Sequence, residues 1–517
     1  MSDSAEVIRC PSCQEALQRN VLLEKELAEL KSEYLALKST IDWFKRQVFG
    51  QKSERQKLPI PGQGELFDLP PSTVEPETTP AAQKPERTHK PRKDRMSTCI
   101  SEEGLRFGDG VEVQEVRIDV AELKDIPAEQ IGEKVMYRLA QRRSSYLVLK
   151  IVRPVLKVTA TKEIVSAPAP ANVLEGSMSD VSLLAGMLVD KFVAHLPLNR
   201  QYERIKAAGI QIARSTLLDY AGKAIDLVRP IAQAQQAHIL KQSYLMMDET
   251  PCKAGISVPG KMRQAYIWPI MSLEQDLCFT YAPSRSGAHV EALLKDFSGT
   301  LLTDGYEVYA QYAREHSDRV RHALCWVHAR RYFDRALNAS PKEAQHALDL
   351  IGSLYHQERL CKEQQGDVLI WRQQQSKPIV ESFFAWVHEQ RQRTDLLPKE
   401  PLSKALNYAS ERRTGLTYFL DDPLLALDTN ALERALRPIP MGRKNWLFCW
   451  TELGAERLAT IQTLLASCRI HEVNPTVYLI DVLQRIQTHP DKDILQLTPR
   501  VWKTLFAEKP MRSLVDT

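Results

Sequence analysis

Two short apolar runs, each followed by an aspartate, constrain the fold of this chain more than any other feature. Residues 243–247, Ser-Tyr-Leu-Met-Met, precede Asp248, and residues 300–303, Thr-Leu-Leu-Thr, precede Asp304. Uninterrupted runs of this kind are typical of strands that are buried on both faces. Two more strand-like runs and a helix-like segment lie between them: 264–270, 277–281 and 288–297. This order allows two parallel neighbouring strands to carry Asp248 and Asp304 side by side.

A pair of neighbouring carboxylates needs a partner. Two buried carboxylates held close together repel each other, and the arrangement is costly unless a proton or a cation bridges them. Mg²⁺ is the obvious bridge, because it prefers oxygen ligands and completes its shell with water and phosphate oxygens. A third acid would be needed to hold a second ion. Glu433 is the candidate, on a predicted helix that has Asp428 or Asn430 as its cap and ends at Pro438.

Each of these acids also has a simpler interpretation. An aspartate at the end of a strand usually forms a turn, and a glutamate on a helix is usually a solvated charge. Only the joint placement of Asp248, Asp304 and Glu433 in this order of strands and helices favours a catalytic site.

A basic stretch follows Glu433. It contains four cations and no acid: Arg434, Arg437, Arg443 and Lys444. A DNA backbone could lie there, because Lys and Arg supply most of the contacts to phosphate. The whole chain has a net charge of only +4, from 69 Lys and Arg against 65 Asp and Glu. Any argument for a nucleic-acid partner must therefore be local.

A heptad pattern occupies residues 23–48. Apolar side chains alternate at spacings of four and three residues: Leu23, Leu27, Leu30, Tyr34, Leu37, Ile41, Phe44 and Val48. With Glu and Lys between them, they predict a coiled coil that joins copies of the chain into a homo-oligomer. Its self-association residues are Leu23, Leu27, Leu30, Leu37 and Ile41. The alternative is an amphipathic helix that packs on its own chain.

Changes in composition divide the N-terminal half. Residues 1–57 hold the coiled-coil helix, and 58–100 form a proline-rich linker with a basic end. Alternating apolar residues predict a small β-rich module over 101–170. A helical period follows over 171–240.

The helical region contains the pattern of a helix-turn-helix. A helix over 198–208 is followed by a turn at Gly209 and by a second helix that begins near Arg214. Arg214, Ser215 and Thr216 at the start of that helix could face base edges in the major groove. An ordinary helical hairpin is the alternative.

Neither a membrane span nor a disulfide framework is expected. No stretch approaches the roughly eighteen apolar residues of a span, and Met1 leads into a polar segment, so we expect a cytoplasmic protein. The nine cysteines are scattered and should be reduced thiols. Cys10, Cys13, His89 and Cys99 are too far apart and too separated by prolines to make a good zinc site, so no zinc is expected.

Five segments, taken in order, resemble the DDE transposases of the insertion-sequence-sixty-six family, TnpC type. They are Asp-Glu-Thr-Pro at 248–251, Thr-Asp-Gly-Tyr at 303–306, Cys-Trp-Val-His-Ala-Arg-Arg at 325–331, Asp-Thr-Asn-Ala-Leu-Glu-Arg-Ala-Leu-Arg-Pro at 428–438, and Gly-Arg-Lys-Asn-Trp-Leu-Phe at 442–448. The resemblance covers nearly the whole chain and includes 49–55, 195–201 and 214–217. One departure is that Cys99 alone lies where many relatives carry paired cysteines that look like a zinc module.

The resemblance implies a multidomain α/β plus α protein. Its RNase H-like core would comprise 241–339 and 426–470, with a helical insertion over 340–425 and a C-terminal helical segment over 471–517. Asp248, Asp304 and Glu433 would be the catalytic triad and would hold two Mg²⁺ ions, with Mn²⁺ as a substitute.

The partners that the resemblance implies are nucleic acid and other proteins of the same element. Double-stranded DNA, as terminal inverted repeats and as target, would be bound, cleaved and joined in a bacterial nucleoid, with help from accessory proteins. Two alternatives stay open: an RNase H-like metal-dependent nuclease without strand transfer, and a non-catalytic DNA-binding scaffold.

The segment 325–331 provides second-tier candidates. Cys325 and His328 have metal-like spacing, but no second pair accompanies them. Trp326, His328 and either Arg330 or Arg331 fit a group that packs a strand on a helix and contacts phosphate. Simple core packing explains them equally well.

Overall fold

The computed structural model describes residues 99–100, 105–121, 127–142, 145–258, 261–443, 445, 449 and 451–516, which belong to a compact unit that runs from Arg92 to Thr517. The expected coiled coil with Leu23, Leu27, Leu30, Leu37 and Ile41 lies outside the described residues, as do most of the linker and Lys444. None of the described helices is both long enough and apolar enough to span a bilayer.

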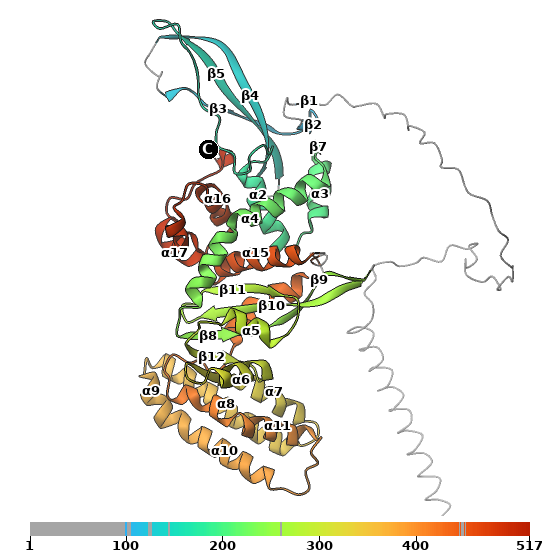
Figure 1. Ribbon diagram of the computed structural model, residues 1–517, viewed down its shortest axis with the longest axis vertical. Coiled ribbons are helices and arrows are strands. Elements are labelled where there is room, and N and C mark those ends of the chain that lie inside the picture. The colour runs from blue at the N-terminus through green and yellow to red at the C-terminus, as the bar shows by residue number, and fades with distance from the viewer. Residues whose placement is uncertain are drawn as a thin grey trace, which may run out of the picture. The chain divides into compact units, whose positions relative to one another are not determined.

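A long hairpin dominates the region in which alternating strands were expected (Figure 1). Strands β4 (Ala128–Arg142) and β5 (Ser145–Val158) pair antiparallel along their whole length. The other edge of β5 pairs with β3 (Val113–Arg117), which is parallel to it, and, further along, with β6 (Ile164–Ser166), which is antiparallel. A separate small sheet joins β1 (Cys99–Ile100), β2 (Arg106–Phe107) and β7 (Ile210–Gln211).

Three helices follow the hairpin: α2 (Val181–Phe192), α3 (Leu198–Ala207) and α4 (Arg214–Ile239). The turn after α3 contains Gly209 with φ +86°, in the left-handed region that glycine enters without strain. The order helix, glycine turn, helix is therefore the predicted one, with β7 between the turn and α4.

The central sheet has the order β11-β10-β8-β12-β13, and β9 pairs with β10 beside it. Its strands are β8 (Tyr244–Met247), β9 (Thr250–Val258), β10 (Lys261–Ser272), β11 (Leu277–Ala282), β12 (Gly299–Thr303) and β13 (Val320–Leu324). Strands β9 to β11 run antiparallel to their partners, whereas β8, β12 and β13 run parallel to one another.

Both faces of this sheet are covered, which explains why β8 is apolar throughout. Tyr244 and Met246 belong to the large core that α4 and α15 (Glu452–Ile470) share with the sheet. Leu245 and Met247 point to the opposite core. That second core is closed by α5 (Gly287–Leu293) and α6 (Glu307–Glu315).

A helical block follows α7 (Trp326–Ala336), in the region for which the resemblance implied an insertion over 340–425 (Figure 1). Its elements are α8 (Pro341–Glu363), α9 (Val368–Trp371), a π-helical turn η2 (Arg372–Ser376), α10 (Lys377–Arg391), α11 (Pro401–Glu411), α12 (Arg413–Thr417) and the 3₁₀ turn η3 (Tyr418–Leu420). Trp326 anchors the block, because its indole N–H donates to the Leu416 carbonyl at 2.9 Å.

The chain returns to the sheet through α13 (Asn430–Leu436) and α14 (Pro438–Gly442), which precede α15. It ends with α16 (Pro475–Arg485), η4 (Asp491–Leu497), α17 (Pro499–Leu505) and η5 (Leu514–Asp516).

Candidate acidic site and DNA-facing surface

Asp248 and Asp304 follow neighbouring parallel strands in the same register. Strand β12 pairs with β8 so that Leu302 lies opposite Met246, and each aspartate comes two residues after that pair. Asp248 Oδ1 accepts the Glu249 N–H at 2.8 Å, and Asp304 Oδ1 accepts the Tyr306 N–H at 2.9 Å. The sequence-based expectation of parallel neighbours is confirmed. Asp304, whose side chain accepts from the residue two positions on, also forms the turn that the simpler interpretation proposed.

The environment of Asp248 disfavours its charge. The pKa of Asp248 is raised to about 7, mainly by burial and further by the carboxylates of Glu249, Asp304 and Glu433, while the hydrogen bond from the Glu249 N–H acts in the opposite direction. A carboxyl group crowded by like charges is a ready ligand for a cation, because a bound cation would offset that repulsion.

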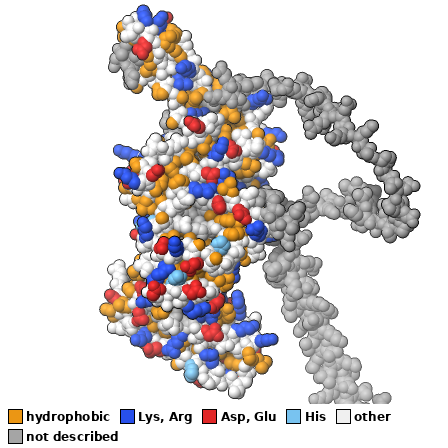
Figure 2. All heavy atoms as spheres, viewed as in Figure 1, with side chains coloured by type: hydrophobic (Ala, Val, Ile, Leu, Met, Phe, Trp, Pro, Cys, Tyr) orange, Lys and Arg blue, Asp and Glu red, His pale blue; other side chains and the backbone are white. Residues whose placement is uncertain are grey.

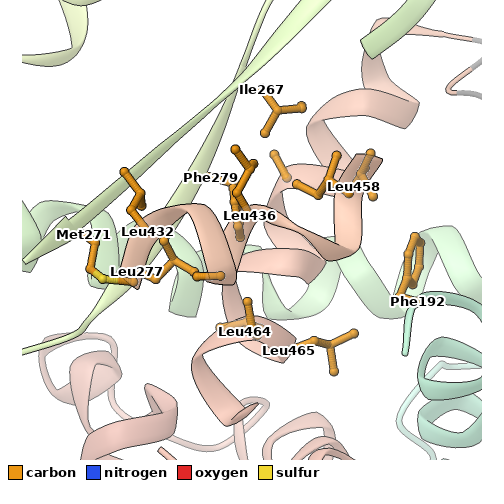
Figure 3. Close-up of a cluster of buried hydrophobic side chains, with 14 of the residues drawn as sticks. Phe192, Ile267, Met271, Leu277, Phe279, Leu432, Leu436, Leu458, Leu464 and Leu465 are labelled. Carbon is orange, nitrogen blue, oxygen red and sulfur yellow. The ribbon is translucent and has the colours of Figure 1, made fainter. Parts of the chain in front are cut away.

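Glu433 is held near Asp248 by the packing of α13. Leu432 and Leu436 are buried against side chains of β10, β11 and α15, as Figure 3 shows, which leaves Glu433 on another face of the helix. Asn430 donates from its backbone N–H and its side chain to Asp428, at 2.9 and 2.7 Å. The N-cap residue of α13 is Thr429, not Asp428 or Asn430 as the sequence suggested, and the Asp428 side chain accepts the first N–H of the helix from one position further back.

An arginine engages Glu433. Nη2 of Arg331 on α7 lies 3.0 and 2.8 Å from the two carboxylate oxygens of Glu433. Nε2 of His328 lies 3.1 Å from Nη1 of Arg331 and 4.0 Å from Glu433 Oε1. Burial lowers the pKa of His328, an effect that Asp304 and Glu433 oppose and Arg331 reinforces. His328 therefore lies close to both Glu433 and Asp304.

Asp248, Asp304 and Glu433 do not bring one carboxylate oxygen each to within 4.8 Å of the other two. Within the described ranges, the group of His, Asp and Glu ligand atoms that all lie within 4.8 Å of one another is His238, Glu274 and Asp276. Arg500 already occupies that group, with contacts of 2.7 Å to Glu274 and 2.9 Å to Asp276. Burial would raise the pKa of Asp276, but hydrogen bonds from His471 and Arg500 lower it. The positive charge of Arg500 offsets the acids of this group, whose ion pairs join α4, the β10–β11 turn and α17.

A pocket of about 490 Å³ brings most of the predicted site together, and we call it the acidic pocket. Its lining is Asp248, His328, Arg331, Asn430, Glu433, Arg434, Leu436, Arg437 and Pro440. Asp304 is absent from this lining, although it acts on the pKa of both Asp248 and His328. Among the described residues, no acid or hydrogen-bond acceptor engages the guanidinium groups of Arg434 and Arg437. They are available to phosphate.

The other predicted DNA contacts lie apart from the acidic pocket. Arg443 donates to the Pro251 carbonyl at 3.1 Å, and Arg330 is exposed on α7. Arg214, at the start of α4 with Ser215 and Thr216, pairs with Glu203 at 2.8 Å and stacks on Tyr202. On the face that Figure 2 shows, cationic and anionic side chains are interspersed. None of Arg214, Arg330 and Arg443 lines the acidic pocket.

In the segment 325–331, some side chains pack in the core and others line the acidic pocket. Cys325 and Trp326 are fully buried, and Cys325 Sγ accepts the backbone N–H of Thr429 at 3.4 Å. Cys325 thus joins α7 to the start of α13, and its metal-like spacing to His328 reflects packing. His328 and Arg331 face the acidic pocket instead.

The turn after Asp304 contains glycine because the helical block approaches it closely. A Cβ at Gly305 would lie 2.6 Å from Tyr408 Oη and 2.8 Å from Arg412 Nε. Arg412 also donates to the Gly305 carbonyl at 3.3 Å. The insertion is thereby fixed against the strand end that carries Asp304.

Sequence reasoning missed one residue of the site, Glu249. Its side chain is only 3% exposed, and it accepts from Arg285 Nε at 2.8 Å and from the Tyr309 hydroxyl at 2.6 Å. The guanidinium of Arg285 lies 3.7 Å from the ring centre of Tyr306. The one signal in the sequence was a second acid directly after Asp248.

Comparison with known proteins identifies the family. Residues 176–457, more than half of the chain, match the family model described as "Transposase IS66 family". Residues 463–500 match the IS66 C-terminal element. Residues 36–98 match a model described as "Transposase C of IS166 homeodomain", which overlaps the expected coiled coil and linker.

Curated relatives are similar over most of their length. The uncharacterized protein y4hP of Sinorhizobium fredii is 30% identical over 406 residues, which cover 74% of this chain and 73% of the relative. The uncharacterized protein y4jD of the same organism is 28% identical over 498 residues, 90% of this chain and 94% of the relative. These matches confirm the resemblance and support a DNA-binding, transposase role. The chain belongs to the IS66 family of transposases.

Proposed function

We propose that this protein cleaves DNA at the ends of an insertion sequence and joins them to target DNA, with Asp248, Asp304 and Glu433 as ligands of divalent metal. The observation that carries the proposal is the parallel register of β8 and β12, with Glu433 in the same pocket as Asp248. The strand order, with β8 in the middle of the sheet, supports the RNase H-like core that the resemblance implied.

The residues present fit a divalent cation. Asp248 is a partly buried carboxyl whose charge is disfavoured by burial and by three neighbouring carboxylates, and Mg²⁺ or Mn²⁺ suits such oxygen ligands. Bound ions would stabilise charge on phosphate oxygens and lower the pKa of water. Arg331 competes with a cation for Glu433, because that arginine contacts both of its carboxylate oxygens and offsets their charge.

The chain's own side chains would bind and orient the DNA. Arg434 and Arg437 would hold phosphates at the rim of the acidic pocket, and Arg331 would exchange Glu433 for a phosphate oxygen. Phosphoryl transfer relies mainly on positioning and charge neutralisation, so no side-chain nucleophile is required.

Substitution of Arg331 tests this exchange. We expect Arg331→Gln to bind Mn²⁺ about tenfold more tightly in the absence of DNA, because Glu433 loses a charge-assisted partner. Its affinity for DNA should fall, and the salt dependence of binding should decrease by about one phosphate contact. Calorimetry with Mn²⁺ and fluorescence anisotropy with DNA measure the two effects. Arg335→Gln on the same helix, outside the acidic pocket, is the control, and an unchanged Mn²⁺ affinity in Arg331→Gln contradicts the exchange.

Purified protein with DNA provides the direct test of function. A duplex that carries the inverted repeat bordering the gene should be cut at its end in Mg²⁺, and a pre-cleaved end should be joined to a second DNA. Cleavage without joining would favour a metal-dependent nuclease. Binding that needs neither metal nor the acids, without cleavage, would favour a non-catalytic scaffold and would overturn the proposal.

We also propose the partners that the family resemblance implied. Copies of the chain would pair through the heptad residues 23–48, and accessory proteins of the same element would assist. Arg214, Ser215 and Thr216 would contact DNA at the start of α4, once Arg214 leaves Glu203.

A further inference from the structure

A second pocket lies beside the acidic pocket and shares two of its arginines. This side pocket has a volume of about 360 Å³, and Arg434 and Arg437 line both pockets. The rest of its wall comes from the end of α2 and the residues after it, from α14, from α15 and from the start of α16, and includes Phe192, Val193, Met441 and Leu465. The two pockets are therefore neighbours across α13.

The side pocket has an apolar interior and an exposed apolar rim. Phe192 and Leu465, which Figure 3 shows on α2 and α15, are buried. Val193 and Met441 at its edge are 47% and 58% exposed. Large apolar side chains that stay this exposed around a hollow mark a surface for a ligand with an apolar face.

The cations around the side pocket lack counter-charges. No acid lines it, whereas three arginines do: Arg434, Arg437 and Arg469. Arg469 donates to the carbonyls of Arg434 and Ala435 at 3.4 and 3.2 Å, and burial lowers its pKa. An anion placed here would gain both hydrogen bonds and charge compensation.

A ligand for this pocket needs an apolar face for its interior and a negative charge for its arginines. A flat apolar ring attached to phosphates has both. A nucleobase has apolar faces that stack on side chains such as Phe and on arginine planes, and its flanking phosphates attract cations. Enzymes that work on DNA take bases out of the stack into pockets of this kind.

We propose that the side pocket receives one unstacked nucleobase of the DNA end, next to the phosphate held at the acidic pocket, while Arg434 and Arg437 bind the phosphates between them. This proposal rests on the proposed function. It adds a binding site for a single base, and it explains why apolar side chains and arginines without an acidic partner in the pocket occur together at this place.

A fluorescent base analogue tests the proposal. Asp248→Asn protein is mixed with end duplexes in which 2-aminopurine replaces one base at a time around the cleavage point. We expect a several-fold rise in fluorescence at one position within a few nucleotides of that point, because unstacking removes quenching by neighbouring bases. The same positions in the free duplex give the reference.

Blocking the pocket distinguishes it from other causes of unstacking. Val193→Trp and Met441→Trp, both at the exposed rim, should each remove the rise when combined with Asp248→Asn. Leu273→Trp, in the turn before β11, is the matched control, since Leu273 is 44% exposed and lines neither pocket, and it should keep the rise.

Two outcomes overturn the proposal: no position brightens, or the brightening persists in both rim variants. Cleavage by wild-type protein is measured on the same duplexes. Normal cleavage without a bright position refutes the base pocket alone, and a bright position without cleavage by wild-type protein refutes the proposed function alone.

Discussion

Asp248→Asn is expected to lower the rate of DNA cleavage by about 10³-fold or more, because an amide cannot replace a carboxylate ligand that contributes several kcal/mol to the transition state. DNA binding should persist, because the arginines of the acidic pocket are unchanged. Cleavage of the end duplex in Mg²⁺ and anisotropy with the same duplex measure the two effects. Cleavage at the wild-type rate would remove Asp248 from the catalytic site.

The same substitution should stabilise the metal-free protein at pH 8. Burial raises the pKa of Asp248 from 3.8 to about 7, so the folded protein binds a proton there more tightly than the unfolded chain does. The resulting stability is fully present below pH 3.8 and is lost as the pH rises through about 7. At pH 8 the wild-type protein carries a disfavoured charge that Asn lacks. We expect a gain of roughly 2–4 kcal/mol in the free energy of unfolding, measured with urea.

A second aspartate, Asp226, provides the control, because its pKa is shifted in the opposite direction. Burial raises the pKa of Asp226 on α4, but hydrogen bonds from Arg457 and Arg229 lower it overall. Asp226→Asn should therefore destabilise the protein at pH 8 and leave cleavage unchanged. Mg²⁺ should stabilise the wild-type protein and Asp226→Asn but not Asp248→Asn. A loss of stability in metal-free Asp248→Asn at pH 8 would contradict the raised pKa.

The strands that carry the two aspartates were predictable because their signal is local. In β8, Leu245 and Met246 point into different cores, so burial on both faces leaves an uninterrupted apolar run. Strand β9 gave no such signal, because its sequence contains Lys253 and a Gly255 with φ +70°. The pairing of β9 with β10 makes this segment a strand. The first half of β4, residues 128–135, is largely exposed on both faces, so its sequence shows little alternation of apolar and polar residues.

The contacts of the site were less predictable than its acids. Asp248 and Asp304 could be placed together because the register of two parallel strands follows from the order of elements. The partners of Glu249 come from the segment before α5 and from α6, and no motif marks Arg285 or Tyr309 as belonging together. The Arg331–Glu433 pair likewise depends on how the helical insertion returns α13 to α7.

Glu249 connects the turns that hold the two aspartates. Its own N–H binds Asp248, and its carboxylate binds Arg285 and Tyr309. Arg285 in turn stacks on Tyr306, whose N–H binds Asp304 and whose hydroxyl donates to the Arg285 carbonyl at 3.1 Å. Burial and the nearby Asp304 raise the pKa of Glu249, but Tyr309 and Arg285 oppose this effect. We therefore propose that this carboxylate positions both strand ends.

Removal of this carboxylate should be among the most damaging changes in the chain. Glu249→Ala leaves Arg285 without its partner and a fully buried Tyr309 hydroxyl without an acceptor. We expect a loss of about 3–5 kcal/mol in the free energy of unfolding, measured with urea. Glu249→Gln retains an acceptor for Tyr309 and should lose less. Mn²⁺ affinity should fall in both variants, because the turns that orient Asp248 and Asp304 lose their common support.

Glu307→Ala is the matched control for this prediction. Glu307 also pairs with an arginine, Arg314, at 2.6 Å, but its side chain is 67% exposed. Water replaces such an exposed partner, so this variant should lose less than about 1 kcal/mol and bind Mn²⁺ normally. Equal losses in Glu249→Ala and Glu307→Ala would mean that burial of the pair contributes nothing. A destabilised Glu249→Ala that still binds Mn²⁺ with wild-type affinity would mean that the network supports the fold but does not orient the two aspartates.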